Sequence, residues 1–274
     1  MKLKRFRKYW AFTKGGILNG FAYKFSAFGW LIGDLVGILI LYFLWSAIYS
    51  NSPTPIINGL SFTDMLTYLI FARIAANLVY SSSSFFIVGE DIYEGGIALS
   101  LIRPMSYRYR VLSNSFGYFL SNIILMIVPL FIVASLILYF VLGVELPSIL
   151  NIICFLISAL LSFVITDGLG FLLGELAIFT NALFGLMLIK NITFTFLSGS
   201  LLPSAFFPEW LQNVLKFLPF QSMIENPIMI LMGRIEGIEI LWTLLIQVIW
   251  CLILGFLCNV TFNKLKKHVV SVGG

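Results

Sequence analysis

Charged residues are scarce in this chain of 274 residues, where Asp, Glu, Lys and Arg together make up 11%. Soluble domains have about 25%, so a folded surface in water would lack the charged groups that it needs. Disorder is excluded as well, because 60% of the residues are hydrophobic and disordered segments are poor in apolar residues. The composition therefore indicates a polytopic membrane protein.

Histidine and cysteine are also rare, and this excludes several classes of enzyme. The chain has one histidine, His268, and three widely spaced cysteines, Cys154, Cys251 and Cys258. Metal and haem sites built on histidine, and Ser-His-Asp or Cys-His catalysis, all need imidazoles that this chain lacks. Three scattered cysteines form no disulfide framework. We therefore expect no metal site, no cofactor in this chain and no catalytic residue.

Six apolar segments are each long enough to cross a bilayer, which takes about 20 helical residues. They cover 27–48, 63–88, 112–142, 147–179, 181–202 and 239–263. The sequence thus predicts an all-α fold in which 1–274 forms a single transmembrane domain with six spans. The third and fourth segments exceed the bilayer thickness, so they tilt, kink or project beyond it. Pro129 offers the third segment a place to kink.

Lysine and arginine gather on one side of these segments. Seven precede the first segment, three lie between the second and third, and three follow the sixth, whereas Lys216 and Arg234 fall on the other side. Because cytoplasmic loops carry the basic excess, we expect both termini in the cytoplasm. The net charge of +5 is explained in the same way and indicates no nucleic-acid partner. Low alanine with high isoleucine, lysine and asparagine favours a bacterial source, and hence the plasma membrane.

The first 25 residues are predicted to form an amphipathic helix. Apolar side chains share one helical face: Leu3, Phe6, Tyr9 and Trp10. Basic side chains share the opposite face: Lys4, Arg5, Arg7 and Lys8. Such a helix lies in the plane of the membrane on anionic lipid. We expect the glycine-containing stretch 14–20 to bend the chain into the first span.

The segment 203–238, expected outside, contains four prolines and so cannot form one continuous helix. An apolar stripe of helical spacing runs from Pro208 to Pro219. The next stretch, 221–232, is too short to span, and Gly233 is a plausible helix terminator. We predict two short re-entrant helices before the last span, a structure that is tolerated where it packs against protein or lines a cavity.

Aromatic residues are dense in this outer segment. They are Phe206, Phe207, Trp210, Phe217 and Phe220. One interpretation is an interfacial aromatic girdle; the other is an external gate that seals a path and opens when a substrate leaves. We favour a gate combined with a girdle, because re-entrant helices would bring these rings near the axis of a dimer.

The largest cytoplasmic loop is expected at 89–110. Three acids, Glu90, Asp91 and Glu94, precede the pair Gly95-Gly96, and Arg103-Pro104 ends a short apolar stretch that includes Leu101. This pattern fits an ordinary turn beside positive charge that faces the membrane. It also fits a short helix that is presented to a soluble partner below the membrane.

Two motifs in the chain resemble the six-span permeases of type-2 ABC exporters, in the branch that includes daunorubicin-type multidrug permeases. The family's Asp-Ile-x-x-Gly and Leu-[Leu/Ile]-Arg-Pro segments are matched by Asp91, Ile92 and Gly95 and by 101–104. Its Phe-Pro-x-Trp-Leu, Pro-Phe, Pro and Gly series is matched by 207–211, Pro219-Phe220, Pro227 and Gly233. The sequence departs from the family at Tyr93, where a polar or charged residue is commoner, and at Lys190 within the fifth span.

The resemblance implies a transmembrane subunit without its own ATPase, and no G-x-x-x-x-G-K-[ST] phosphate loop occurs in the sequence. ATP and magnesium would be bound by separate ABC ATPase subunits. A second permease, either another copy or a related chain, would complete the path through the lipid bilayer. The resemblance assigns docking on the ATPase to the 89–110 loop, through these residues: Glu90, Asp91, Glu94, Gly95, Leu101, Arg103 and Pro104.

Five ionisable residues fall within the predicted spans, where an unpaired charge costs about 2.5–3.5 kcal/mol or more. They are Asp34, Arg73, Asp167, Glu175 and Lys190. From their depth we expect Lys190 to pair with Asp167 or Asp34. No acid lies at the depth of Arg73, so Arg73 is expected to face a dimer interface, a water-filled path or an anionic group of a substrate.

The sequence thus favours the transmembrane subunit of an ATP-driven exporter. An apolar, aromatic cavity suits an amphipathic drug, lipid or peptide as substrate. The alternative is a secondary transporter driven by an ion gradient, which the five buried charges could support, although no inverted repeat is evident. An intramembrane enzyme lacks clustered acids and histidines, and a channel lacks a recognisable filter sequence.

Overall fold

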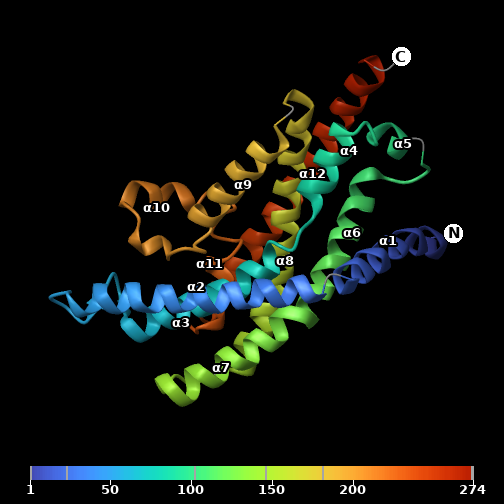
Figure 1. Cartoon of the computed structure of the whole chain (residues 1–274). Coiled ribbons are helices and arrows are strands. Elements are labelled where there is room, and N and C mark those ends of the chain that lie inside the picture. Colours follow the sequence, from blue (N-terminus) through green and yellow to red (C-terminus); the bar gives the residue numbers. More distant parts are fainter. Residues whose placement is uncertain (1, 23, 102, 146, 181, 273–274) are drawn as a thin grey trace.

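The computed structural model describes residues 2–22, 24–101, 103–145, 147–180 and 182–272, with the side chains at 2–6, 24, 26–28, 78, 99, 101, 141 and 267–272 left out. The described part is helical apart from one small hairpin and its connections (Figure 1). The long helices are α1 (Lys2–Ala22), α2 (Lys24–Ser50), α3 (Phe62–Val79), α6 (Tyr107–Asn122), α7 (Val128–Leu142), α8 (Ile149–Glu175), α9 (Leu183–Leu197) and α12 (Ile238–Val272).

Shorter elements connect these helices. They are the antiparallel strands β1 (Ile56–Ile57) and β2 (Leu60–Ser61), the helices α4 (Ser84–Tyr93), α5 (Ile97–Leu101), α10 (Glu209–Leu215) and α11 (Glu225–Leu231), the π-helix η1 (Ile123–Ile127), and the 3-10 turns η2 (Leu176–Phe179) and η3 (Ser204–Phe206).

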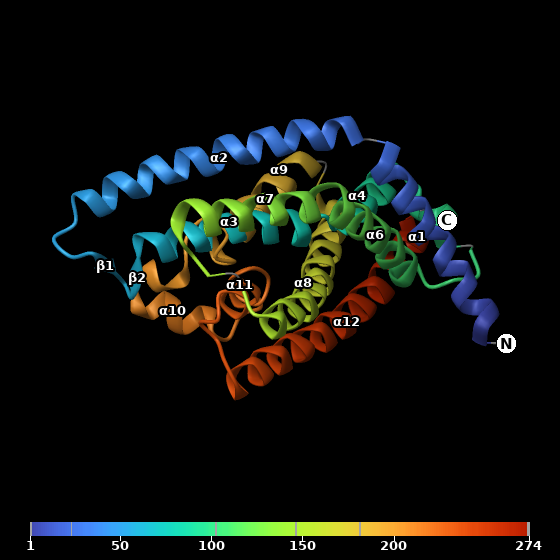
Figure 2. The same cartoon turned by 90° about the horizontal axis from the view of Figure 1, so that it is seen from below.

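The two termini lie at one end of the molecule, and the β1–β2 hairpin and α10 lie at the opposite end (Figures 1 and 2). We call these the termini end and the hairpin end. The chain runs from the termini end to the hairpin end in α2 and returns in α3 and α4. It then passes out in α6 and α7, back in α8, out in α9 and back in α12 (Figure 2). The loop between α4 and α6 therefore lies at the termini end.

Among the described residues, four helical stretches are long and apolar enough to cross a membrane: Gly29–Ser50, Tyr107–Phe140, Ile149–Phe179 and Ile238–Lys266. They correspond to the first, third, fourth and sixth predicted spans. The other two predicted spans coincide with α3 together with α4, and with the shorter apolar helix α9. The structure thus confirms an all-helical membrane fold, and the number six remains a prediction.

The expected continuous helix over 63–88 is wrong, because the backbone leaves the helix between Val79 and Ser84. This break contains the serine run 81–84. Serine hydroxyls compete for hydrogen bonds with the helical backbone, and here Ser82 and Ser84 both donate to the carboxylate of Asp167 on α8. The bonds across to α8 hold the chain in its non-helical path.

The third pass is discontinuous at the predicted proline. The π-helix η1 ends directly before α7, which has Pro129 in its first turn. Proline has no N–H and its ring clashes with the preceding turn, and a π-bulge is one of the ways in which a helix absorbs such a defect. In Figure 1, α6 and α7 run at clearly different inclinations.

The N-terminal helix differs from its prediction in the glycine stretch 14–20. We expected a bend there, but α1 is continuous to Ala22. Its glycines instead allow close packing on α6: a Cβ built on Gly16 would lie 3.0 Å from the Cα of Gly117. The backbone N–H of Ser106 also donates to the hydroxyl of Tyr9 at 3.1 Å. Tyr9, predicted on the lipid face, therefore packs on protein, while Trp10 is exposed.

A second close approach joins α4 to α8 in the core. Gly170 and Gly174 are four residues apart on α8, and a Cβ on Gly174 would lie 2.9 Å from the carbonyl oxygen of Phe85. Small residues at this spacing let helix backbones approach closely. The start of α4, where Ser84, Phe85 and Val88 are buried, is therefore packed firmly on α8.

Replacing Gly117 with alanine should separate α1 from α6. The added Cβ would lie 2.8 Å from the Cα of Gly16 and the backbone nitrogen of Ile17, which cannot yield as a flexible side chain can. We expect a loss of about 1–3 kcal/mol of stability, measured by thermal unfolding, together with faster proteolysis of α1. Gly15→Ala is the matched control, because no atom lies within 4 Å of its added Cβ. Equal stability of the two variants would contradict the packing assignment.

Candidate functional site

The loop at the termini end presents most of the residues that were predicted to dock on a partner. Glu90, Glu94 and Gly95 are exposed around the end of α4, and Arg103 and Pro104 are exposed after α5. Gly95 has a φ of +74°, which favours glycine and reverses the chain between α4 and α5. Two predicted positions remain, Leu101 and Asp91, and the side chain of Leu101 lies outside the described residues.

Asp91 belongs to the same predicted set, but its carboxylate points back into the protein. It accepts hydrogen bonds from Arg110 Nη2 at 2.7 Å and from the Tyr107 hydroxyl at 2.9 Å. Tyr107 in turn stacks on Phe262 of α12, with ring centroids 4.6 Å apart. Asp91 therefore ties α4 to the start of α6, and through Tyr107 the loop is joined to α12.

A buried ion pair joins the first turn of α6, which follows this loop, to α8. Arg108 Nη1 contacts Asp167 Oδ2 at 2.5 Å, with 7% of the arginine side chain exposed and none of the aspartate. Asp167 also accepts from Ser82 and Ser84, and the Ser84 hydroxyl lies 3.1 Å from that of Ser115. We call these residues, Arg108, Asp167, Ser82, Ser84 and Ser115, the Asp167 cluster. It joins the α3–α4 break to α6 and α8.

The predicted pairing of Lys190 with Asp167 or Asp34 is wrong. Asp167 pairs with Arg108 instead. Arg108 lies in the first turn of α6, which begins at Tyr107, and its side chain is buried rather than exposed in the loop. Lys190 Nζ lies 4.9 Å and 5.5 Å from the ring centroids of Phe85 and Phe86. A cation is attracted to the face of an aromatic ring, so Lys190 is held by these rings, and it has no ion pair among the described residues.

Glu175 is buried at the termini end of α8, and its Oε1 has no hydrogen-bond partner among the described residues. With Thr261 and Lys264 of α12 it lines a mainly apolar cavity of ≈ 440 Å³. Glu175 takes part in neither the Arg108–Asp167 ion pair nor the Arg73–Asp34 ion pair described next.

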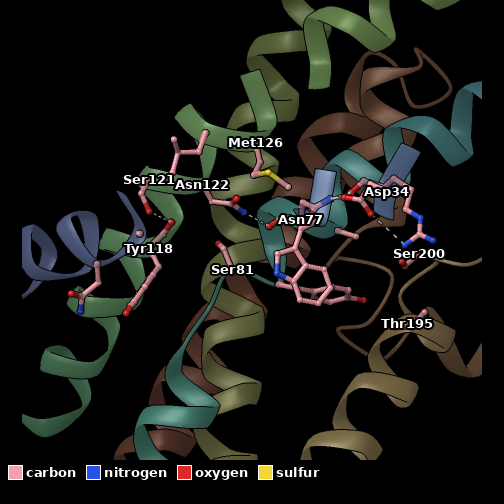
Figure 3. A pocket seen from close by; sticks show the side chains of 16 residues that line it. Asp34, Asn77, Ser81, Tyr118, Ser121, Asn122, Met126, Thr195 and Ser200 are labelled. Atoms are coloured by element: carbon pink, nitrogen blue, oxygen red, sulfur yellow. Dashed lines mark hydrogen bonds and ion pairs between the residues drawn. The ribbon is translucent and has the colours of Figure 1, made fainter. Parts of the chain in front are cut away.

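Asp34 and Arg73 line one cavity, of ≈ 530 Å³ (Figure 3). The expectation that no acid matches Arg73 is wrong, since its Nη1 lies 3.7 Å from Asp34 Oδ1. The amide of Asn77 donates to Asp34 Oδ2 at 2.5 Å, and the amide of Asn122 donates to the backbone carbonyl of Asn77. The cavity therefore has a polar wall from α2, α3 and α6, and Thr195 and Ser200 reach it from the α9 side.

At the hairpin end, α10 and α11 stand where two short helices were predicted, and Gly233 ends the second with a φ of +67°. Arg234 Nη2 contacts Asp64 Oδ1 at 2.6 Å and ties this segment to α3. The hydroxyl of Ser61 also donates to Asp64 Oδ2 at 2.8 Å. Asp64 is therefore held both by the residue that precedes its own helix and by the segment that follows α11.

The five aromatic residues of the outer segment do not form one cluster. Phe206 packs edge-on against Trp45 of α2, with ring centroids 5.2 Å apart. Phe207 lies tilted against Phe196 at 5.0 Å, and Phe220 packs edge-on against Phe194 at 6.2 Å. Trp210 and Phe217, by contrast, are 67% and 81% exposed. Three rings therefore attach the outer segment to α2 and α9, and two lie on its outer face.

Sequence reasoning missed Arg108, Ser82 and Ser84 in the Asp167 cluster, and Asn77 and Asn122 in the cavity. Arg108 was assigned to the positive cytoplasmic loop, and the serine run 81–84 lay within the predicted span 63–88. The sequence did indicate that such partners exist, because Asp167 is an acid in an apolar segment and a charge there needs partners. Finding which partners it has requires the tertiary contacts.

Breaking the Asp167 cluster should strongly destabilise the protein. Arg108→Met leaves a buried, unpaired carboxylate, and Asp167→Asn leaves a buried, unpaired guanidinium, so each should cost about 3–5 kcal/mol. The double variant should be more stable than either single variant, because no charge is then left alone. Thermal unfolding of the purified protein measures these losses of stability. Arg103→Met is the control, because Arg103 is an exposed arginine in the same region. Additive losses in the double variant would refute a direct pair.

The family comparison agrees with this architecture. A model of the ABC-2 family transporter protein matches residues 35–270, which is most of the chain. No curated protein matches it. The matched region contains α3 to α11, the Asp167 cluster and Arg73 of the cavity, and Asp34 lies directly before its first residue. The chain therefore belongs to the ABC-2 family of transporter proteins, as a multi-pass membrane permease subunit of an ABC transporter.

Proposed function

We propose that this chain is one of two permeases in an ATP-driven exporter of the bacterial plasma membrane, in the daunorubicin and multidrug branch of the family. Separate ABC ATPase subunits bind ATP and magnesium below it. In this proposal the chain has six spans, the termini end faces the cytoplasm and the hairpin end faces outward. The second permease is another copy or a related chain.

The observation that carries this proposal is the placement of the α4–α6 loop. Family membership implies ABC ATPase partners, and the loop offers exposed acids at Glu90 and Glu94 and an exposed base at Arg103. It projects at the same end as both termini (Figure 1). A soluble ATPase that docks here meets charge of both signs, and such patterns set the specificity and orientation of an interface.

The internal bonds of the loop supply a route for motion in this proposal. Asp91 holds the loop to Tyr107 and Arg110, and the Asp167 cluster holds the start of α4 to α6 and α8. When the ATPase dimer closes, the loop carries α4 with it, and the tight contacts on Gly170 and Gly174 pass the movement to α8. Packed elements of this kind move as rigid bodies rather than deforming.

The cavity that holds Asp34 and Arg73 is the part of the translocation path that this chain contributes in the proposal. Its walls come from α1, α2, α3, α6, η1 and α9. At the hairpin end, Phe206 and Phe207 attach the outer segment to α2 and α9. Parting of these aromatic contacts opens the path outward, while the exposed Trp210 and Phe217 provide the girdle.

One observation favours a second candidate, a transporter driven by an ion gradient. The buried carboxylate of Glu175 has an oxygen without a hydrogen-bond partner among the described residues, and buried acids serve as proton relays in such transporters. The test below separates the two candidates, because an ion-driven transporter requires no ATPase.

The proposal predicts that the tagged chain, purified in mild detergent, retains a stoichiometric ATPase with a phosphate-binding loop. Mass spectrometry identifies it and any second permease. A folded chain that is recovered without an ATPase would reject the proposal in favour of the ion-driven candidate.

Reversing the charge of the exposed loop should weaken this retention. Glu94→Lys and Arg103→Glu are each expected to lower the amount of ATPase per permease about fivefold, since interface residues that matter cost more than about 1 kcal/mol when altered. Glu145→Lys, an exposed acid between α7 and α8 at the hairpin end, is the matched control. Full retention in both loop variants would remove the docking role from this loop.

A further inference from the structure

The cavity of ≈ 530 Å³ contains an arginine whose charge is only partly balanced. Arg73 has one ion pair among the described residues, the 3.7 Å contact with Asp34, and 39% of its side chain is exposed. A guanidinium has five N–H donors, so most of them are left for a ligand. Exposed donors in an otherwise apolar membrane segment are costly unless an acceptor meets them.

Asp34, by contrast, is already well satisfied. One oxygen accepts from Asn77 at 2.5 Å and the other faces Arg73, and 15% of the side chain is exposed. Asn77 also donates to the backbone carbonyl of Arg73, so this asparagine holds the acid and the backbone of the base together. The pair therefore presents donors rather than acceptors to the cavity.

The other walls of the cavity are suited to an apolar body. Ala76, Leu125 and Met126 line it, as do the rings of Trp30, Tyr80 and Tyr118. Met126 and Tyr118 are labelled in Figure 3. Its volume of ≈ 530 Å³ falls within the range of about 300–1,000 Å³ for sites that hold drug-sized molecules. Trp30 is 73% exposed, so α2 forms an open side through which an amphipathic molecule can enter from the bilayer.

The position of the guanidinium depends on one glycine. A Cβ built on Gly37 of α2 would lie 2.7 Å from Arg73 Nη2 and 3.3 Å from its Cζ. Glycine at this position therefore makes room for the end of the arginine side chain next to Asp34. The fold itself does not need this glycine, because a flexible side chain can move away from an added methyl group.

From these contacts we infer that the cavity binds an amphipathic anion, whose carboxylate or phosphate head is held by Arg73 and whose apolar body lies along Leu125, Met126 and Trp30. A planar guanidinium binds either head through two parallel hydrogen bonds. The inference rests on the proposed function, because it names the class of substrate that this cavity takes.

Competition binding tests the class directly. The purified chain in nanodiscs of neutral lipid is titrated with radiolabelled dodecanoate, with empty nanodiscs as the blank, and unlabelled compounds compete. Dodecanoate and dodecyl phosphate should compete at least about tenfold more strongly than dodecanol or dodecyltrimethylammonium, since hydrogen bonds to a charged group contribute about 1.5–3 kcal/mol. The stronger of the two anions distinguishes a fatty acid from a phosphate-bearing lipid as the source of the head.

Three variants locate the site. Arg73→Gln should bind dodecanoate at least about tenfold more weakly and dodecanol as before. Gly37→Ala, which keeps the arginine but moves its end, should weaken dodecanoate severalfold, whereas Gly33→Ala, with no atom within 4 Å of the added methyl group, should leave it unchanged. If Arg73→Gln does not fold with Asp34 unpaired, the neutral double variant Asp34→Asn/Arg73→Gln replaces it.

Several results would overturn the inference: equal competition by dodecanol and dodecanoate, stronger competition by the ammonium compound, full dodecanoate binding in Arg73→Gln, or competition by inorganic phosphate as strong as by dodecyl phosphate. Binding requires neither ATP nor a partner, so its failure is separate from that of the proposed function. Loss of anion selectivity with a retained ATPase rejects this inference alone, and anion selectivity without an ATPase rejects the exporter alone.

Discussion

An ionised side chain inside an apolar protein must be matched by partners, and this constraint determines how the termini end of the molecule is built. The carboxylate of Asp167 is fully buried on α8. It is matched by Arg108 from α6 and by Ser82 and Ser84 from the break between α3 and α4. Three segments that are distant in sequence are therefore held at one point. Removing any one of them would leave a polar group buried without its partner.

The same contacts explain how α4 is held in place although the residues at its end are exposed. Ser84 binds Asp167 at the start of α4, and Asp91 binds Tyr107 and Arg110 near its end. Gly174 allows the backbone of Phe85 to pack closely on α8 between these two attachments. The exposed residues Glu90 and Glu94 are thus carried on a short helix fixed at both ends, a rigid support of the kind that a docking element requires.

The two ion pairs of the predicted membrane region differ in a way that bears on function. Arg108 and Asp167 are in close contact and almost fully buried, and further hydrogen bonds satisfy the acid. Arg73 and Asp34 are farther apart, and the arginine remains open to a cavity. The first pair has the geometry of a structural tie between helices. The second leaves donors available, which is the property expected of a binding site in the membrane.

Local sequence determined the class of fold, because the free energy of placing apolar helices in lipid is summed over a contiguous run and needs no knowledge of neighbours. It also located the discontinuity at Pro129, the helix end at Gly233 and the exposed loop around Gly95, each of which depends on backbone chemistry at one position. The tertiary structure decided which charges pair, that the serine run interrupts a helix, and that glycines 16 and 117 pack α1 on α6 rather than bend it. Depth along a helix could not predict these contacts, because a long arginine reaches across helices and its partner depends on the face that each helix turns inward.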